Sequence, residues 1–116
     1  MKKKELSFFR TQALNLVQAM YGYITPNYRC ISLTVAKSII YIHVILEEKN
    51  DDEITEITEE CMTEFEALQI SGEVNYKLNI ISSHSKNIRC LEEGLYGITI
   101  YQRKEESFLN NEEYFE

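Results

Sequence analysis

Residues 50–69 read NDDEITEITEECMTEFEALQ, and this stretch decides the fold that the sequence predicts. Apolar residues recur in it at spacings of three and four, the repeat of one face of an α-helix, while acids occupy the other sides. Asn50 is a favourable N-cap, and Glu53 follows three residues later as in a capping box. The acidic first turn complements the positive end of the helix dipole. We therefore predict a helix that begins at Asn50 and buries Ile54, Ile57, Cys61, Phe65 and Leu68.

Charge is concentrated in the same stretch. Between Asp51 and Glu66 there are eight acidic residues and no basic one, so this segment carries −8 and the remainder of the chain sums to +1. Surface helices usually mix charges of both signs at i,i+4, because like charges at that spacing repel. A solvated helix face is the ordinary explanation of acids on a helix. The complete lack of Lys and Arg favours instead a surface that meets a cationic partner.

Length and composition indicate a single soluble domain. A chain of 116 residues with 44% hydrophobic and 27% charged residues can bury a core without disulfides or metal. The acidic balance argues against nucleic-acid binding and against docking on an anionic membrane, and basic proteins are the expected partners. We find neither an export signal after Met1 nor an apolar run long enough for a membrane span. Three widely spaced cysteines, at positions 30, 61 and 90, fit reduced thiols in the cytoplasm.

The rest of the chain alternates between helical and strand periodicity. A first helix is predicted over residues 5–21, ended by Gly22 and Pro26, and a β-hairpin over residues 28–48 with its turn near Ala36-Lys37-Ser38. A third strand is predicted at residues 74–80 and a last strand at 96–103, joined by a polar connection with a helical turn at 87–92. We expect one domain over residues 1–103, followed by an acidic tail over 104–116 that is frayed or ordered by a partner.

The predicted fold class is α+β, in the order αββαββ. Because each strand has one apolar face, both helices should cover the same side of a four-stranded, mainly antiparallel sheet, which gives a two-layer sandwich. The other sheet face is then open, and its aromatic side chains make it a candidate second contact surface, including for a homodimer. That face is predicted to present Tyr28, Cys30, Ser32, Thr34, Tyr41, His43, Ile45, Asn75, Lys77, Asn79, Thr99, Tyr101 and Arg103, of which Tyr41, His43, Tyr101 and Arg103 are the chief candidates.

No motif for catalysis or cofactor binding stands out. His43 lies in a strand and His84 lies in a polar loop, and neither has a nucleophile and an acidic partner at a recognisable spacing. His43, His84 and Cys90 lack the clustering of zinc modules, so we predict no metal site. A phosphate-binding glycine loop is also missing. We expect no cofactor and no enzymatic activity.

Three segments, taken together and in order, carry a family resemblance. Residues 13–19 (ALNLVQA) run into residues 22–29 (GYITPNYR), a β-hairpin follows that ends at residues 46–48 (LEE), and the acidic helix ends with residues 64–69 (EFEALQ). The combination resembles a family of small bacterial immunity proteins, which accompany polymorphic toxins, including those of contact-dependent growth inhibition. The resemblance spans roughly residues 11–81. Pro26, Asn27 and Arg29 match its pattern, and we interpret them as architectural residues, with Arg29 paired to a carboxylate of the neighbouring helix.

The resemblance implies a cytoplasmic protein, without catalytic activity, that binds a cognate toxin C-terminal domain and blocks it. Many such toxins are basic nucleases, with transfer RNA as one candidate substrate, and an acidic surface would compete for their phosphate-binding groove. Two alternatives stay open: a homo-oligomeric adaptor that pairs through the open sheet face, and a small hydrolase or ligand-binding domain that uses His43 or His84. The acidic tail is a candidate second arm. The predicted toxin-binding residues are Asp52, Glu53, Glu56, Glu59, Glu60 and Glu64.

Overall fold

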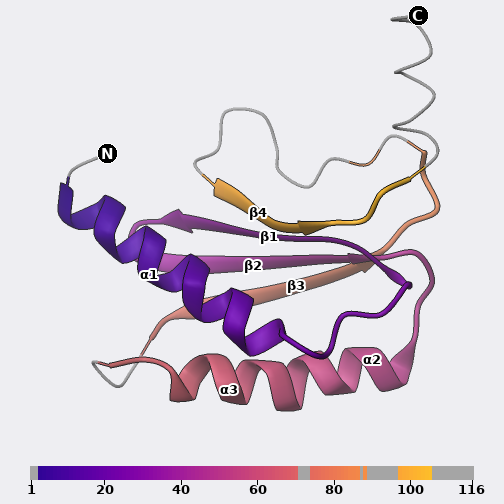
Figure 1. The fold of residues 1–116 in the computed structure, drawn as a ribbon, viewed down its shortest axis with the longest axis horizontal. Helices are drawn as coiled ribbons and strands as arrows, with labels where there is room; N and C mark the ends of the chain where they lie inside the picture. Colours follow the sequence, from indigo (N-terminus) through magenta and orange to yellow (C-terminus); the bar gives the residue numbers. More distant parts are fainter. Residues whose placement is uncertain (1–2, 71–73, 87, 89–96, 106–116) are drawn as a thin grey trace, which may run out of the picture.

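The computed structural model describes residues 3–70, 74–86, 88 and 97–105 (Figure 1). The predicted helical turn at 87–92 and the tail beyond Glu105 lie outside these residues. The predicted order αββαββ is matched only in part, because the second predicted helix is divided into three successive segments. The elements are α1 (Lys3–Met20), β1 (Tyr28–Ala36), β2 (Ile39–Leu46), α2 (Asp51–Thr55), η1 (Glu56–Cys61), α3 (Met62–Ala67), β3 (Tyr76–Ser82) and β4 (Gly97–Gln102).

The four strands form a mixed sheet in the order β3-β2-β1-β4. β1 pairs antiparallel with both β2 and β4, as predicted, but β2 pairs parallel with β3. The prediction of a mainly antiparallel sheet is therefore wrong for this last pair. The cause is the helix from Asp51 to Ala67, which returns the chain to the end of the sheet where β2 began, so that β3 starts alongside the start of β2.

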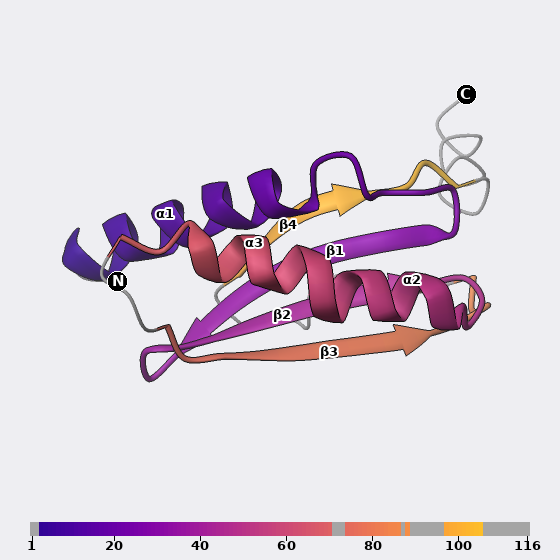
Figure 2. The same ribbon diagram turned by 90° about the horizontal axis from the view of Figure 1, so that it is seen from below.

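Both helices cover one face of the sheet, as predicted (Figure 2). α1 lies toward the β4 edge, and the α2–η1–α3 helix lies over the rest of that face. On α1 the helical spacing predicts a buried stripe of Leu6, Phe9, Ala13, Leu16, Val17 and Met20. That prediction is wrong in part, because Val17 is 46% exposed while Gln12 and Ala19 are buried. The apolar core between the layers contains Leu16, Ala19, Met20, Tyr28, Ile31, Leu33, Ile40, Ile42, Val44, Leu46, Ile57, Cys61, Met62 and Phe65.

Two β-bulges change which side chains face the helices. In the β1–β2 ladder the register shifts between Tyr28 and Cys30, and Tyr28 joins the core instead of the open face. In the β1–β4 ladder the register shifts between Ile31 and Ser32, which leaves Tyr101 opposite the core residue Ile31. Each bulge adds one residue to a strand and so reverses the alternation beyond it. The predicted alternation is wrong at Tyr28 and Tyr101 for this reason.

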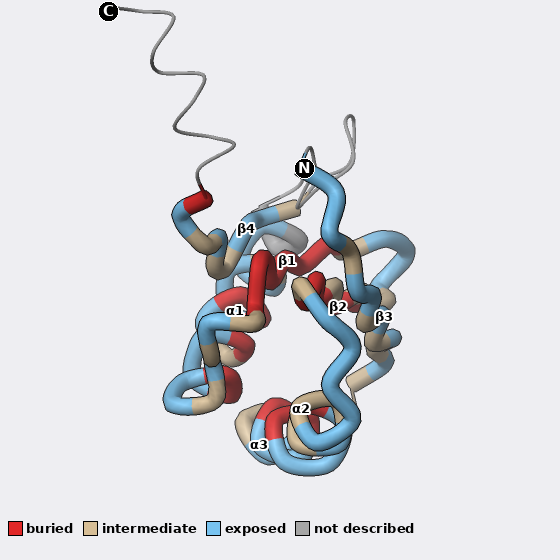
Figure 3. The backbone as a smooth tube through the Cα atoms, turned by 90° about the vertical axis from the view of Figure 1, so that its right-hand side faces the viewer, coloured by how far each residue is buried: buried red, intermediate tan, exposed pale blue. Residues whose placement is uncertain are grey.

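The central strand β1 is buried along most of its length (Figure 3). Cys30, Ser32 and Thr34, predicted for the open face, are all buried. No described helix or strand lies on that face of the sheet. The β1–β2 hairpin closes through Lys37 and Ser38, whose φ angles of 52° and 66° are both left-handed, as in the two-residue turns that match strand twist.

The cysteines differ from one another. Cys61 is free and buried in the core, as its place in the apolar stripe predicted. Cys30 forms a disulfide, whose partner lies outside the described residues, so the expectation that all the thiols are reduced is wrong for Cys30. Within the described part of the chain, no helix has both the length and the apolar character that crossing a membrane requires.

Candidate interaction surface

The acidic helix presents most of its carboxylates to solvent. Five of the six predicted toxin-binding residues lie on its outer sides: Asp52, Glu59, Glu60 and Glu64 are exposed and Glu56 is half-buried. None of the five carboxylates forms an ion pair with another residue of the described chain. We call Asp52, Glu56, Glu59, Glu60 and Glu64 the acidic surface.

Glu53, the sixth predicted residue, has a different place. Its backbone N–H donates to Asn50 Oδ1 at 3.0 Å, which confirms the predicted N-cap. Its carboxylate, however, accepts hydrogen bonds from the Thr25 hydroxyl and, at 2.7 Å, from Asn27 Nδ2. Glu53 therefore links the start of the helix to the α1–β1 turn. Its negative charge is partly offset by these two hydrogen bonds within the protein.

The middle of the helix is wound as a π-helix over Glu56–Cys61. The backbone N–H of Met62 donates to the carbonyl of Ile57, five residues earlier. Cys61, the last residue of this segment, and Met62 after it are both buried in the core. Segments of π-helix occur frequently at functional sites. Three acids of the acidic surface, Glu56, Glu59 and Glu60, lie on this segment.

Tyr23, which the sequence analysis did not single out, lies beside the acidic surface. Partial burial raises the pKa of its phenol, and the negative charges of Glu60, Glu64 and Glu56 raise it further. The side chain packs partly against the core and comes from the α1–β1 turn. Tyr23 therefore adds an aromatic group to a surface that is otherwise anionic. Its position in a loop between two elements gave no periodic signal from which it could be predicted.

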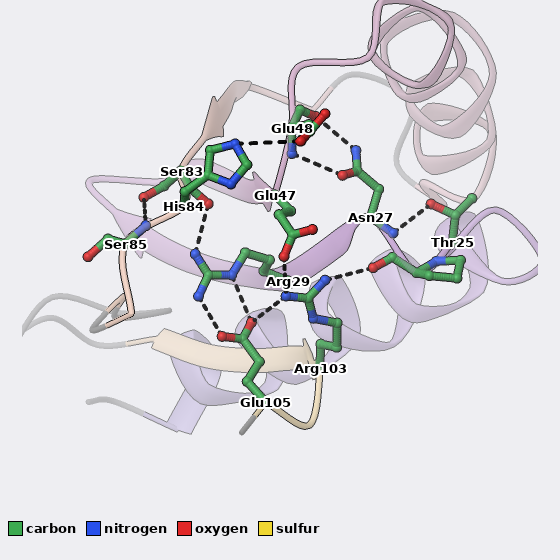
Figure 4. A network of polar contacts seen from close by, with 11 residues as sticks. Thr25, Asn27, Arg29, Glu47, Glu48, Ser83, His84, Ser85, Arg103 and Glu105 are labelled. Atoms are coloured by element: carbon green, nitrogen blue, oxygen red, sulfur yellow. Dashed lines mark hydrogen bonds and ion pairs between the residues drawn. The ribbon is translucent and has the colours of Figure 1, made fainter. Parts of the chain in front are cut away.

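A polar network holds the end of the sheet next to the start of this helix (Figure 4). Asn27 Oδ1 accepts from the backbone N–H of Glu48, and Asn27 Nδ2 donates to the Glu48 carbonyl, both at 2.9 Å. This confirms Asn27 as an architectural residue. Arg103 donates to the Pro26 carbonyl at 2.8 Å and pairs with Glu47 at 2.9 Å. The turn, the end of β2 and the chain after β4 are thus tied together.

Arg29 is also architectural, but its partner is not the predicted one. It forms a buried ion pair with Glu105, which follows β4, rather than with a carboxylate of the neighbouring helix. The error arises from the bulge at the start of β1, because there the side chains, including that of Arg29, do not alternate regularly between the two faces of the sheet. Glu105, assigned by prediction to the start of the tail, is buried.

The candidate second surface is divided by the structure. Tyr41 and His43 lie in β2 opposite Thr34 and Ser32, and both are half-buried. Tyr101 instead packs partly against the core, and Arg103 is engaged with Glu47 and Glu105. The four predicted residues therefore do not form one surface.

The histidines have separate surroundings. His43 Nε2 lies 3.2 Å from Thr34 Oγ1, and His84 Nε2 lies 3.8 Å from Glu48 Oε1 at an exposed site. In the part of the chain that the structure describes, no three His, Cys, Asp or Glu side chains are grouped to hold a metal ion. The feature that the described residues do provide is the solvent-exposed acidic surface.

A comparison with protein families shows to which family the chain belongs. The family model described as MafI2 immunity protein matches residues 11–105. The chain belongs to the MafI2 immunity protein family. The match includes the whole acidic helix and both partners of the Arg29–Glu105 ion pair. No curated protein matches the chain. Membership in the MafI2 family assigns the chain to the bacterial toxin immunity proteins, which confirms the resemblance found in the sequence.

Proposed function

We propose that this protein neutralises its cognate toxin by placing the acidic surface against a basic face of the toxin domain. One observation carries the proposal: five carboxylates lie together on one helix with no basic residue between Asp51 and Glu66 to offset them. Their mutual repulsion is relieved when a cationic surface binds. Such a field also steers a positively charged partner and raises its association rate.

The toxin that fits this surface is a nuclease of a contact-dependent inhibition system, with transfer RNA as a candidate substrate. A nuclease must grip phosphates with Lys and Arg, so its substrate groove is positively charged. The acidic surface presents carboxylates where the nucleic acid would present phosphates. We infer inhibition by occupation of that groove, without any chemical reaction by the immunity protein.

We place the complex in the cytoplasm, where the RNA substrate of such a toxin lies. The Cys30 disulfide is the observation that opposes this location, because thiols are kept reduced there. Rescue of growth by a Cys30→Ala variant produced in the cytoplasm would show that the bond is dispensable for protection. Loss of rescue, with the variant still folded, would favour an oxidising compartment.

The direct test measures association with the purified cognate toxin domain. A triple variant, Glu56→Gln, Glu59→Gln and Glu60→Gln, removes three negative charges from the acidic surface. A control variant, Asn75→Lys, Asn79→Lys and Ser82→Lys, changes the net charge equally at exposed sites on β3 and just before it. Association rates are measured over a range of salt concentrations, and growth is measured with the toxin expressed.

We expect the glutamine variant to associate about tenfold more slowly at low salt and with a weaker salt dependence, because steering is lost. The lysine control should change the association rate much less. Equal effects of the two variants would mean that only net charge matters and that the acidic surface is not the contact. Unchanged kinetics in the glutamine variant would refute the proposal.

A further inference from the structure

The flank of α1 that faces away from α3 is apolar and exposed. Gln12 marks the opposite side of this helix, because its amide exchanges two hydrogen bonds of 2.9 Å with the amide of Gln69 beyond α3. At 100° per residue, Leu14, Val17 and Tyr21 lie about 200°, 140° and 180° around the helix from Gln12. Their exposed fractions are 70%, 46% and 84%. We call Leu6, Leu14, Val17 and Tyr21 the α1 flank; their spacing continues through Arg10.

A helix that simply faces water carries polar residues at such positions, as α1 does at Arg10. Beyond Arg10 the exposed apolar residues Leu14, Val17 and, directly after α1, Tyr21 adjoin one another, and such a group marks an interaction site. The α1 flank is also the part of α1 that the predicted stripe misassigned, since Val17 was expected in the core. Leu6, at 36% exposure, extends the flank toward the start of the helix.

β4 lies at the sheet edge next to α1, and it carries no charged residue (Figure 2). Among the described strands it pairs only with β1. Ile98 is 40% exposed, and it lies opposite the core residue Leu33, on the face that α1 covers. Edge strands of natural proteins usually carry charged side chains, which prevent pairing with another chain. At the other edge of this sheet, β3 carries Lys77. An uncharged edge of β-forming residues is suited to pairing with another chain.

The distribution of charge over the two sheet edges favours a second copy of this chain as the partner that binds at the β4 edge. Approach through the β3 edge would bring two acidic helices together, each within a segment of charge −8. Approach through the β4 edge keeps those helices at opposite ends of the pair. α1 itself carries Lys3, Lys4 and Arg10 against Glu5, and β4 is neutral, so the net negative charge of the chain does not oppose contact there.

The same surface is self-complementary. When an edge strand pairs antiparallel with its copy about a two-fold axis, both sheets continue with their helices on the same face. Strands lie about 4.8 Å apart, so helices that cover the two edge strands approach to the roughly 8–10 Å at which helices pack. The bulge at Ile100 interrupts regular pairing, and we therefore assign the strand contact to Gly97–Thr99.

We propose that the protein forms a two-fold dimer through the α1 flank and the adjoining edge of β4. Both acidic surfaces then face outward, and each dimer can hold two toxin domains. The proposal does not depend on the nature of the toxin.

The test is the mass of the full chain in solution, measured by sedimentation velocity over a range of concentrations. The wild-type protein should approach twice its 13.7 kDa chain mass as concentration rises. A variant with Leu14→Glu and Val17→Glu should remain monomeric, and because both side chains are exposed it should keep its circular dichroism spectrum. A matched control, Tyr41→Glu and Asn79→Glu, adds the same two negative charges on the open sheet face and should dimerise like the wild type.

A monomeric wild-type protein at all concentrations would overturn the proposal, as would a dimer that only the open-face variant dissociates. Toxin binding separates this result from the proposed function. The flank variant should bind the toxin one-to-one with wild-type salt dependence. If the flank variant loses toxin binding and the wild-type protein is monomeric, the α1 flank is a toxin contact and the dimer proposal is wrong.

Discussion

Arg29 and Glu105 form a bidentate ion pair across 76 residues of sequence, at the end of the sheet where β1 begins. Arg29 Nε donates to Glu105 Oε2 at 2.8 Å, and Nη2 donates to Oε1 at 2.5 Å. Both residues are buried, and Arg29 Nη1 also donates to the Ser83 carbonyl at 2.8 Å. One guanidinium therefore connects β1 to the residues that follow β3 and β4.

Replacing Glu105 by Gln should destabilise the protein by about 3–5 kcal/mol, because it leaves the Arg29 guanidinium buried without its counter-charge. Urea unfolding of the variant, compared with the wild type, measures this loss. Glu59→Gln is the control, because Glu59 is exposed and its carboxylate has no ion pair with a described residue; its effect should stay within about 0.5 kcal/mol. A loss no larger than that of the control would show that the pair does not hold the sheet together.

Acid should weaken this contribution in a predictable direction. Hydrogen bonds from Arg29 hold the pKa of Glu105 below its ordinary value of 4.5, so the unfolded chain takes up a proton first as the pH falls. The stability from Glu105 is complete above 4.5 and is lost as the pH falls through the lower pKa of the folded state. The difference in unfolding free energy between wild type and Glu105→Gln should therefore shrink below pH 4.5. A difference that is constant with pH would contradict this.

The Cys61 thiol should be inert in the folded protein. Burial raises its pKa to about 12, with a further contribution from the charges of Glu56, Glu60 and Glu64. At about pH 8.5, where an ordinary thiol is half ionised, Ellman's reagent should not reach it. The reagent should release one more equivalent of thiolate from unfolded wild type than from unfolded Cys61→Ala. Rapid labelling of Cys61 in the native protein would show that the acidic helix opens at this position.

Tyr28→Phe should leave stability unchanged or raise it by up to about 1 kcal/mol. The Tyr28 hydroxyl is buried in the core and has no hydrogen-bond partner among the described residues, so its removal relieves a desolvation cost. Tyr76→Phe is the matched control, because the Tyr76 side chain is only half-buried and its hydroxyl interacts with the Glu66 carboxylate; it should cost about 0.5–1.5 kcal/mol. A larger loss at position 28 than at position 76 would indicate that the buried hydroxyl has a partner.

Local signals in the sequence predicted the helices and strands. The orientation of several side chains and their partners depends on tertiary contacts, which these signals do not contain. The helix beginning at Asn50 and the hairpin follow from periodicity and capping, which operate within a few residues. The bulges that move Tyr28 and Tyr101 cannot be seen in a single strand, because each exists only relative to a partner strand. Similarly, Glu53 carries the same charge as its neighbours, and only the approach of Thr25 and Asn27 separates it from them.

The acidic helix thus contains a residue that stabilises the fold, Glu53, beside acidic residues that face solvent. This difference affects how the protein can evolve. The side chains of Glu59, Glu60 and Glu64 are exposed and form no ion pair with a described residue, so under the proposed function substitutions there should change which toxin is recognised at little cost in stability. By contrast, substitution of Glu53 or of either partner of the Arg29–Glu105 pair destabilises the fold and so impairs binding of every toxin. A lineage facing a changing toxin can therefore explore new specificities on one side of a single helix while its fold stays constant.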